Sequence, residues 1–401
     1  MPQDAPRRRG RPPNPHRRAE VVHAAARAFH RHGFAGTSMK EVAASLGITA
    51  SALYRHSAGK MDLLDAALET GLADVEAALG PPETPLAPTL RALARSGLRR
   101  ADFWTLIRRD VRHLGSERQR VVRLRMREVV DGVGIRLRRE RPGLGESELA
   151  LLTRASLATL SVPSQFGRRG VAGPVECLLA DRALAVAMLP IEAAPEPFPL
   201  RVATPFDPDA SARERLMSCS ARLFAHSGFS SVSLAEIGAA AGIAGPGVYR
   251  HFAGKTDLLV GVLRRASEWV ALDLEAALAL DDPLAALHRM VHDHVEIAVR
   301  NWELFRVFQI ESRELPPADR AWILRSHRTF TDSLVAQLRA ARPELDEHAA
   351  RVAGLAAIAI VNDLAGSPRL RAESSFPPRL AATVLGCLGV PTAGPLNHGA
   401  R

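Results

Sequence analysis

Apolar residues recur along most of the chain at the spacing of an α-helix. Near the N-terminus, one face of a helix is marked by Val22, Ala25, Ala26 and Phe29. This pattern stops at Gly33. Sustained alternation of apolar and polar residues, which is typical of strands, is rare in the chain. Since Ala, Leu and Arg are abundant and compatible with helix, we predict an all-α protein.

The residues after Gly33 predict two further short helices. Ser38 precedes Glu41 by three residues, which is the spacing of a capping box at a helix N-terminus. Gly47 suits the positive φ angle at which helices often stop, and residues 53–56 are expected to lie on the third helix. Two short helices joined by such a turn predict a helix-turn-helix, which presents its second helix to the major groove of DNA. The alternative is an ordinary helical hairpin.

The same features recur 195 residues further along the chain, between Gly33 and Gly228. Without any gap, Gly47, Tyr54 and Lys60 correspond to Gly242, Tyr249 and Lys255. Beyond this stretch the likeness weakens but continues, and Trp104 falls on Trp302. Two spaced repeats of this length indicate a duplicated two-domain unit instead of a solenoid of short repeats.

Composition shifts indicate where the domains begin and end. Prolines are dense among the arginines of the first residues and again between the two copies, and proline disfavours helix in the residue before it. The expected order is a flexible basic arm (1–16), a first helix-turn-helix domain (17–68), a first helical domain (69–189), a Pro-rich linker (190–210), a second helix-turn-helix domain (211–263), a second helical domain (264–392) and a flexible tail (393–401).

The chain is long enough for several domains and strongly basic. Its 401 residues are 47% hydrophobic, so sizeable cores can be buried. The formal net charge of +10 indicates an anionic partner, either nucleic acid or an anionic membrane surface, although an arginine-rich composition alone gives the same charge.

Nothing in the sequence predicts export or membrane insertion. Cys177, Cys219 and Cys387 are far apart and have no metal-binding or redox spacing, which fits a reducing compartment. The N-terminus lacks the apolar segment of a signal peptide. The most apolar run, residues 352–361, is too short to span a bilayer. We expect a soluble cytoplasmic protein with no membrane partner.

Basic and polar side chains gather around each predicted turn. The Tyr-Arg-His sequence that begins at Tyr54 is followed by Lys60, and side chains of these types bind phosphate oxygens and base edges. Ahead of the first copy, Arg9 and Arg11 belong to an extended Arg-Gly-Arg-Pro segment suited to a narrow minor groove. A solvated basic tail is the alternative for that segment.

Both copies resemble the TetR family of transcription regulators. The shared features are Phe-x-x-x-Gly-Phe, Ser-x-x-Glu, Gly-Ile, Tyr-x-His and Lys-x-Asp-Leu-Leu, all in register. In the first copy the resemblance implies DNA contacts by Lys40, Thr49, Ala50, Ser51, Tyr54, Arg55 and His56, with Lys60 holding a phosphate. In the second copy the matching positions are Ala244, Gly245, Pro246, Gly247, Tyr249, Arg250, His251 and Lys255, with Ala235 in place of the lysine.

Two departures from the family pattern distinguish the copies. Ser57 stands where the family and the second copy have phenylalanine, at Phe252 in this chain. The second copy carries Gly-Pro-Gly from Gly245, which offers few side-chain donors, so this copy is expected to bind mainly phosphates. An alternative is that the second module is only a dimerisation scaffold.

The resemblance implies a repressor that dimerises through its C-terminal domain and releases operator DNA when a small molecule enters that domain. Because one chain carries two modules, we hypothesise an intrachain pseudo-dimer on an asymmetric operator, with a homodimer as the alternative. An apolar effector is expected, and candidate pocket residues are Phe103, Trp104, Trp302, Phe305 and Phe308. Aromatic residues at helical spacing are also typical of an ordinary core.

One cluster favours a different class, a helical metalloprotein. His288, His292 and Glu296 recur every four residues on one helical face, and two histidines with a carboxylate can bind zinc or iron. No phosphate-binding loop or nucleophile motif accompanies them. The preferred interpretation is a regulator with no metal, no cofactor and no catalytic activity.

Overall fold

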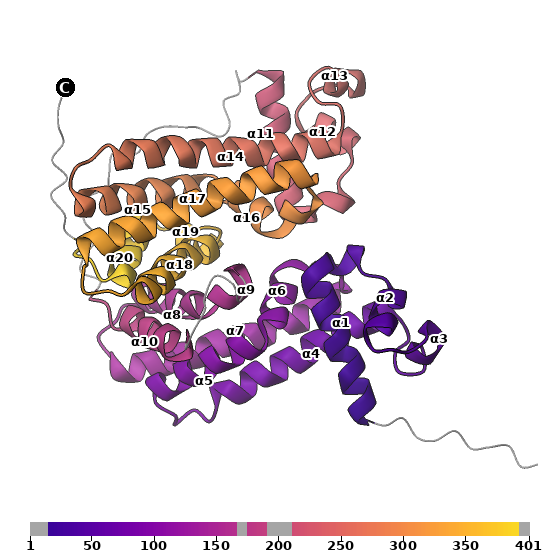
Figure 1. Cartoon of the computed structure of the whole chain (residues 1–401), viewed down its shortest axis with the longest axis horizontal. Helices are drawn as coiled ribbons and strands as arrows, with labels where there is room; N and C mark the ends of the chain where they lie inside the picture. The colour runs from indigo at the N-terminus through magenta and orange to yellow at the C-terminus, as the bar shows by residue number, and fades with distance from the viewer. Residues whose placement is uncertain (1–14, 167–174, 191–210, 393–401) are drawn as a thin grey trace, which may run out of the picture. The chain divides into compact units, whose positions relative to one another are not determined.

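The computed structural model describes residues 15–166, 175–190 and 211–392. Every regular element within these ranges is an α-helix or a short 3-10 helix, which confirms the predicted all-α fold (Figure 1). Most of the predicted arm and of the Pro-rich linker, and the predicted tail, lie outside the described residues, as do Arg9 and Arg11. No described helix is both long and apolar enough to cross a membrane.

The first copy begins with a long helix and two short ones. Gly33 has a φ of +79°, so the regular helix stops there as predicted, although the last residues of α1 continue to Gly36. The helices of this copy are α1 (Pro15–Gly36), α2 (Met39–Ser45), α3 (Ala50–Leu53), α4 (Lys60–Leu79), α5 (Leu86–Arg99), α6 (Ala101–Arg109), α7 (Ser116–Glu140), α8 (Glu146–Leu160), α9 (Val162–Phe166) and α10 (Val175–Ala187).

The second copy follows the same order of long and short helices. Its helices are α11 (Ala212–Ser227), α12 (Leu234–Ala240), α13 (Gly245–Tyr249), α14 (Lys255–Leu278), α15 (Pro283–Arg300), α16 (Trp302–Glu311), α17 (Pro317–Ala341), α18 (Glu347–Leu364), α19 (Pro368–Arg371) and α20 (Phe376–Leu388). The repeat therefore continues through the region in which the likeness of the two sequences has faded.

The chain forms two compact units, and their division does not follow the repeat. The first unit contains the described residues up to Ala78 together with Arg100–Val129. The second contains Leu79–Arg99 and everything described from Val130 onward, so it holds α8 and α10 of the first copy as well as the whole second copy. The domain boundaries expected from the sequence remain predictions.

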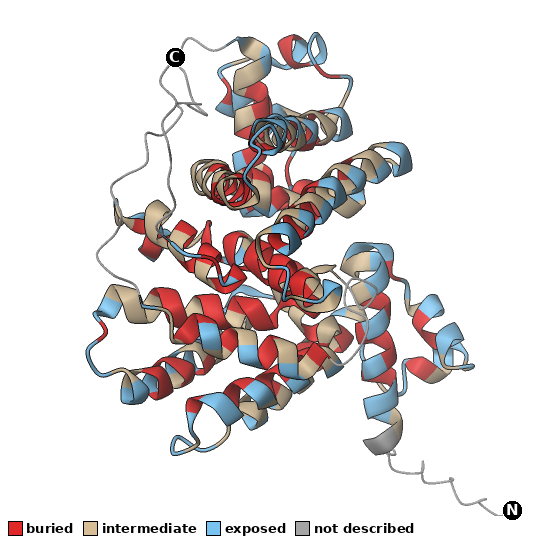
Figure 2. Cartoon of the chain, turned by 60° about the vertical axis from the view of Figure 1, so that its left-hand side comes forward, coloured by how far each residue is buried: buried red, intermediate tan, exposed pale blue. Residues whose placement is uncertain are grey.

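Within the second unit, helices of the two copies pack against one another. α8 contacts α18 and α20, and α10 contacts the same two helices (Figure 1). Every residue of α18 from Val352 to Val361 is buried, which is typical of a helix surrounded by others on all faces. Figure 2 shows such bands of buried residues along the helices. The apolar run noted in the sequence is thus a core helix.

Candidate nucleic-acid interface

The turn in each module is fixed by its caps, as the sequence predicts. The backbone N–H of Ser38 donates to Oε2 of Glu41 at 2.7 Å, and the N–H of Glu41 donates to Oγ of Ser38 at 3.2 Å. Ser233 and Glu236 make the same pair of bonds at 2.6 and 3.2 Å. Gly47 and Gly242 have φ angles of +64° and +66°. The capping boxes and glycine stops are confirmed.

The third helix ends earlier than the sequence predicts. α3 spans Ala50–Leu53, with Oγ1 of Thr49 accepting the N–H of Ala52 at 3.2 Å. The residues predicted to be helical after Leu53 form a turn, in which the N–H of His56 donates to the carbonyl of Leu53 at 2.9 Å. Leu53 is fully buried and anchors the helix, while the turn carries the Tyr-Arg-His sequence to the surface.

The first module exposes polar side chains of the types that bind DNA. Tyr54 is 54% exposed, which is unusual for a large aromatic residue. The exposed positions among the predicted contacts are Lys40, Thr49, Ser51, Tyr54 and Arg55, whereas Ala50 and His56 are half-buried. The first module therefore exposes hydroxyl, phenol, ammonium and guanidinium groups.

The second module presents a different surface at the matching positions. Tyr249 is 63% exposed. The other exposed positions are Ala235, Ala244, Gly245, Pro246, Arg250 and His251. Gly247, which the resemblance places at the DNA, is buried. The Ile243 side chain covers it so closely that a Cβ atom on residue 247 would lie 2.8 Å from Cγ2 of Ile243. This surface has fewer side-chain donors at the start of its recognition helix, as the sequence predicts.

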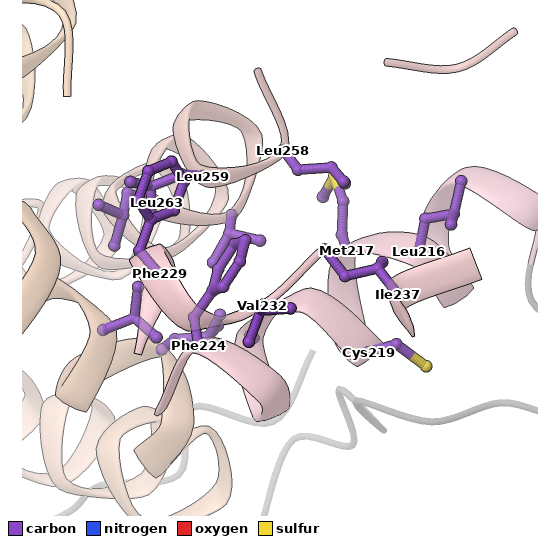
Figure 3. Packing of buried hydrophobic residues seen from close by; sticks show 14 of the residues in the cluster. Leu216, Met217, Cys219, Phe224, Phe229, Val232, Ile237, Leu258, Leu259 and Leu263 are labelled. Carbon is purple, nitrogen blue, oxygen red and sulfur yellow. The ribbon is translucent and has the colours of Figure 1, made fainter. Parts of the chain in front are cut away.

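The module cores hold these surfaces in place. In the second copy, Phe224 and Phe229 pack with their ring centroids 5.3 Å apart, and Ile237 and Val248 belong to the same buried cluster. Figure 3 shows how this cluster gathers side chains from α11, α12 and α14. Phe252 of the second copy and Ser57, which matches it in the first copy, are both buried. Oγ of Ser57 donates to the carbonyl of Gly59 at 2.8 Å.

Lys60 and Lys255 have an internal role that the sequence did not reveal. Nζ of Lys60 donates to the carbonyl of Thr37 at 2.8 Å, and Nζ of Lys255 donates to the carbonyl of Val232 at 2.8 Å. Each ammonium also lies over a phenylalanine ring, 4.5 Å from its centroid. Burial is the main cause that lowers the pKa of Lys60. These bonds tie the fourth helix of each copy to the preceding turn, and the phosphate contact that the resemblance implies for these lysines stays a prediction.

Each module is also held by the sixth helix of its own copy. In the first unit, Nη2 of Arg109 donates to the carbonyl of Phe29 at 2.6 Å. In the second unit, Nε of Arg306 donates to the carbonyl of Ala225 at 2.8 Å, and the N–H of Phe229 donates to buried Glu311 at 3.0 Å. Arg109, Arg306 and Glu311 could not be recognised from the sequence, because charged residues on a helix are normally solvated.

The second copy contains an apolar cavity of about 50 Å³ between α14, α15, α16, α17 and α18. Phe305 and Phe308 line it, whereas Trp302 does not. The Trp302 ring instead lies 5.4 Å from that of His226. The lining residues are Leu263, Ala266, Ser267, Val270, His294, Leu304, Phe305, Phe308, Ser326, His327, Phe330 and Asn362.

The candidate pocket residues of the first copy belong to its packed interior. Phe103 is fully buried against Gly71, where a Cβ atom would lie 2.1 Å from the Phe103 ring. The half-buried Trp104 packs edge-on against Phe103 with ring centroids 5.3 Å apart.

The three residues of the metal alternative do not form a site. Among the described residues, no group of three histidine, cysteine or acidic side chains is placed to hold a metal ion. The rings of His288 and His292 stack at 6.3 Å, while Glu296 pairs with Arg300 at 3.4 Å.

Comparison with known proteins identifies the class. The family of bacterial regulatory proteins called the tetR family matches residues 21–67 and again residues 216–262. A tetracyclin repressor-like C-terminal domain matches residues 280–366. The chain is a DNA-binding transcriptional regulator. It belongs to the TetR family, with two N-terminal units in tandem.

Several solved structures are similar to parts of the chain. A TetR-family regulator from Bordetella parapertussis is 20% identical and covers 44% of this chain and 94% of its own, with a TM-score of 0.42. PfmR from Thermus thermophilus is 23% identical over 46% of this chain and 100% of its own, with a TM-score of 0.40. A tetR-family protein from Rhodococcus is 24% identical over 45% and 96%, with a TM-score of 0.39. No curated protein matches the chain.

Proposed function

We propose that this regulator is a ligand-responsive repressor whose two copies act as a pseudo-dimer within one chain and bind an asymmetric operator. The observation that carries the proposal is the burial of α18 between helices of both copies. A family member that dimerises needs a partner for these helices, and here α8 and α10 of the same chain supply it.

The contacts between the copies combine an apolar centre with polar bonds at its ends. Oγ of Ser161 donates to Asp363 at 3.1 Å. Nη1 of Arg182 donates to the carbonyl of Cys387 at 2.9 Å. Nη1 of Arg379 donates to Oγ of Ser147 at 2.8 Å. A buried apolar patch with a polar rim is the usual anatomy of a specific interface.

The two exposed recognition surfaces support an asymmetric operator. In the proposal, Ser51 and Arg55 select bases in one half-site, while Tyr54 and Lys40 contact its phosphates. Tyr249, Arg250 and His251 bind the other half-site with less selection of bases, since Ala244, Gly245 and Pro246 provide no side-chain donor. Arg9 and Arg11 are proposed to reach the adjacent minor groove.

The contacts of α16 support ligand response in the second copy. This helix carries Phe305 and Phe308 on the cavity wall. It also carries Arg306, which binds the carbonyl of Ala225, and Glu311, which binds the N–H of Phe229. We propose that a ligand in the cavity shifts α16, moves the second module and weakens binding to the operator. The chain is proposed to act by occupancy of DNA and to carry no catalytic activity.

Footprinting tests this function. Genomic fragments selected by the full chain are footprinted, and the mass of the complex is measured by light scattering against the chain mass of 43.3 kDa. We expect one chain on an asymmetric site that spans two major grooves. Arg55→Ala and Arg250→Ala form a matched pair, and each is expected to lose protection of one half-site only.

Other outcomes separate the alternatives. Two chains on a symmetric site would replace the pseudo-dimer by a homodimer. Protection of one half-site, unaffected by Arg250→Ala, would reduce the second module to a scaffold. Binding without sequence preference that disappears at moderate salt would contradict the regulator itself.

A further inference from the structure

The cavity of the second copy has an aromatic and uncharged lining. Phe305, Phe308 and Phe330 contribute three phenylalanine rings, and His294 and His327 contribute two imidazoles. Among the lining residues that the structure describes, none carries a carboxylate, an ammonium or a guanidinium group. A ligand that enters this space exchanges water for ring faces and ring edges.

His294 is the unusual member of this lining. It is 9% exposed, and neither of its ring nitrogens has a hydrogen-bond partner in the described part of the chain. Its ring stacks on Phe330 at a centroid distance of 4.6 Å and meets Phe305 edge-on at 5.4 Å. Buried polar groups in native proteins are nearly always hydrogen-bonded, so an unpaired buried imidazole beside a cavity indicates a partner that comes with the ligand.

The second histidine extends the same surface. The ring of His327 stacks on Phe308 at 5.1 Å with an interplanar angle of 16°. Burial lowers the pKa of His327 to about 4 and that of His294 to about 3. Both imidazoles are therefore neutral near pH 7. A carboxylate in this cavity would lose its hydration without gaining a cation, which is strongly unfavourable.

We propose that the cavity binds a neutral aromatic compound that carries a hydroxyl group on its ring, with the hydroxyl paired to His294. A neutral imidazole has one donor and one acceptor nitrogen, and a hydroxyl group satisfies either of them. The ring of the ligand lies among Phe305, Phe308 and Phe330, where offset and edge-on packing adds to the gain from apolar burial. This inference rests on the proposed ligand response.

The small size of the cavity links the binding of a ligand to a displacement of α16. Its volume of about 50 Å³ is well below the roughly 150 Å³ of an apolar cavity that holds benzene. A ring is fully enclosed only if the lining moves outward. Phe305 and Phe308 both lie on α16, so enclosure of a ring is expected to displace the helix that holds Ala225 and Phe229 of the second module.

Calorimetric titration of the full chain with three probes of similar size tests the proposal. Phenol is the hydroxylated ring, toluene has a methyl group in place of the hydroxyl, and benzoate carries a charge. We expect phenol to bind at least ten-fold more tightly than toluene, and benzoate to show no binding. If the unaltered chain bound benzoate as tightly as phenol, or bound phenol and toluene with equal affinity, the proposal would be overturned.

A matched pair of variants locates the hydroxyl. His294→Phe keeps an aromatic ring in the stack and is expected to bind phenol and toluene equally. His226→Phe changes an exposed histidine that does not line the cavity, and is expected to keep the full preference for phenol. If the His294→Phe variant still bound phenol more tightly than toluene, His294 would not be the partner of the hydroxyl group. Footprinting of the same samples separates this proposal from the proposed ligand response. If phenol binds but the protection of DNA persists, the ligand response is contradicted while the assignment of the cavity stands.

Discussion

Nδ2 of Asn362 donates a hydrogen bond to Oε1 of Gln165 at 3.0 Å, and this bond joins the second copy to the first at the wall of the apolar cavity. The carbonyl of Asn362 also accepts a bond of 3.1 Å from Gln309 on α16. A ligand that displaces α16 is therefore expected to change a contact between the copies as well as the contacts to the second module.

The junction between the copies predicts a sharp steric effect at Gly386. A Cβ atom at this position would lie 2.5 Å from Cδ2 of Leu189, which belongs to the first copy. Gly386→Val is expected to lower the free energy of unfolding by about 1–3 kcal/mol through overpacking, measured by urea denaturation. Gly143→Val is the control, because no atom lies within 4 Å of a Cβ atom there. Equal stability of the two variants would show that the copies do not meet at Gly386.

The bond between Lys60 and the carbonyl of Thr37 predicts that Lys60 affects the stability of the module but not its salt-dependent binding to DNA. Lys60→Met removes the bond to Thr37 and is expected to lower the free energy of unfolding by about 1–3 kcal/mol. Because the ammonium is held by carbonyl oxygens, the slope of log affinity against log salt is expected to stay unchanged. The measurements are urea denaturation and a salt titration of binding to the selected operator.

Lys40→Met provides the opposite result and serves as the control. Lys40 is exposed on α2, so its removal is expected to leave stability unchanged and to reduce the salt slope by about 1. If Lys60→Met reduced the slope at unchanged stability, Lys60 would be a phosphate contact after all.

Two neighbouring glycines predict how the second recognition helix is held. A Cβ atom at Gly247 would lie 2.8 Å from Cγ2 of Ile243, whereas nothing lies within 4 Å of one at Gly245. Gly247→Ala is expected to displace the helix, to destabilise the module by about 1–3 kcal/mol and to weaken protection of its half-site. Gly245→Ala is expected to retain stability. Thermal denaturation and footprinting measure both effects, and a stable Gly247→Ala variant with normal protection would argue against this packing.

Local features of the sequence predicted the modules well. The capping pair of Ser38 and Glu41 and the stop at Gly47 depend only on neighbouring residues, so their spacing was sufficient. The duplication was equally visible, because the modules keep the same glycines and caps in register.

Features that depend on distant packing were not predictable from the sequence. The resemblance placed Gly247 at the DNA. Its burial could not be foreseen, because it depends on where the Ile243 side chain lies. The role of Lys60 depends on a carbonyl 23 residues earlier, and lysines are normally solvated. Trp302 and Phe305 are both aromatic residues of α16, yet only Phe305 faces the cavity. Periodicity gives the face of a helix but not the neighbour that covers it.

The buried histidines predict a loss of stability in mild acid. Burial lowers the pKa of His294 to about 3 and that of His327 to about 4, whereas a histidine in the unfolded chain titrates near about 6.5. Between these values the unfolded chain binds more protons, so stability is fully present above about pH 6.5 and falls as the pH drops toward 4. Urea denaturation at pH 7.5, 6.5 and 5.5 measures this trend. His294→Phe is expected to flatten this dependence of stability on pH, because it removes one of the two buried imidazoles. Stability that rises toward pH 5.5 would contradict neutral burial of these imidazoles.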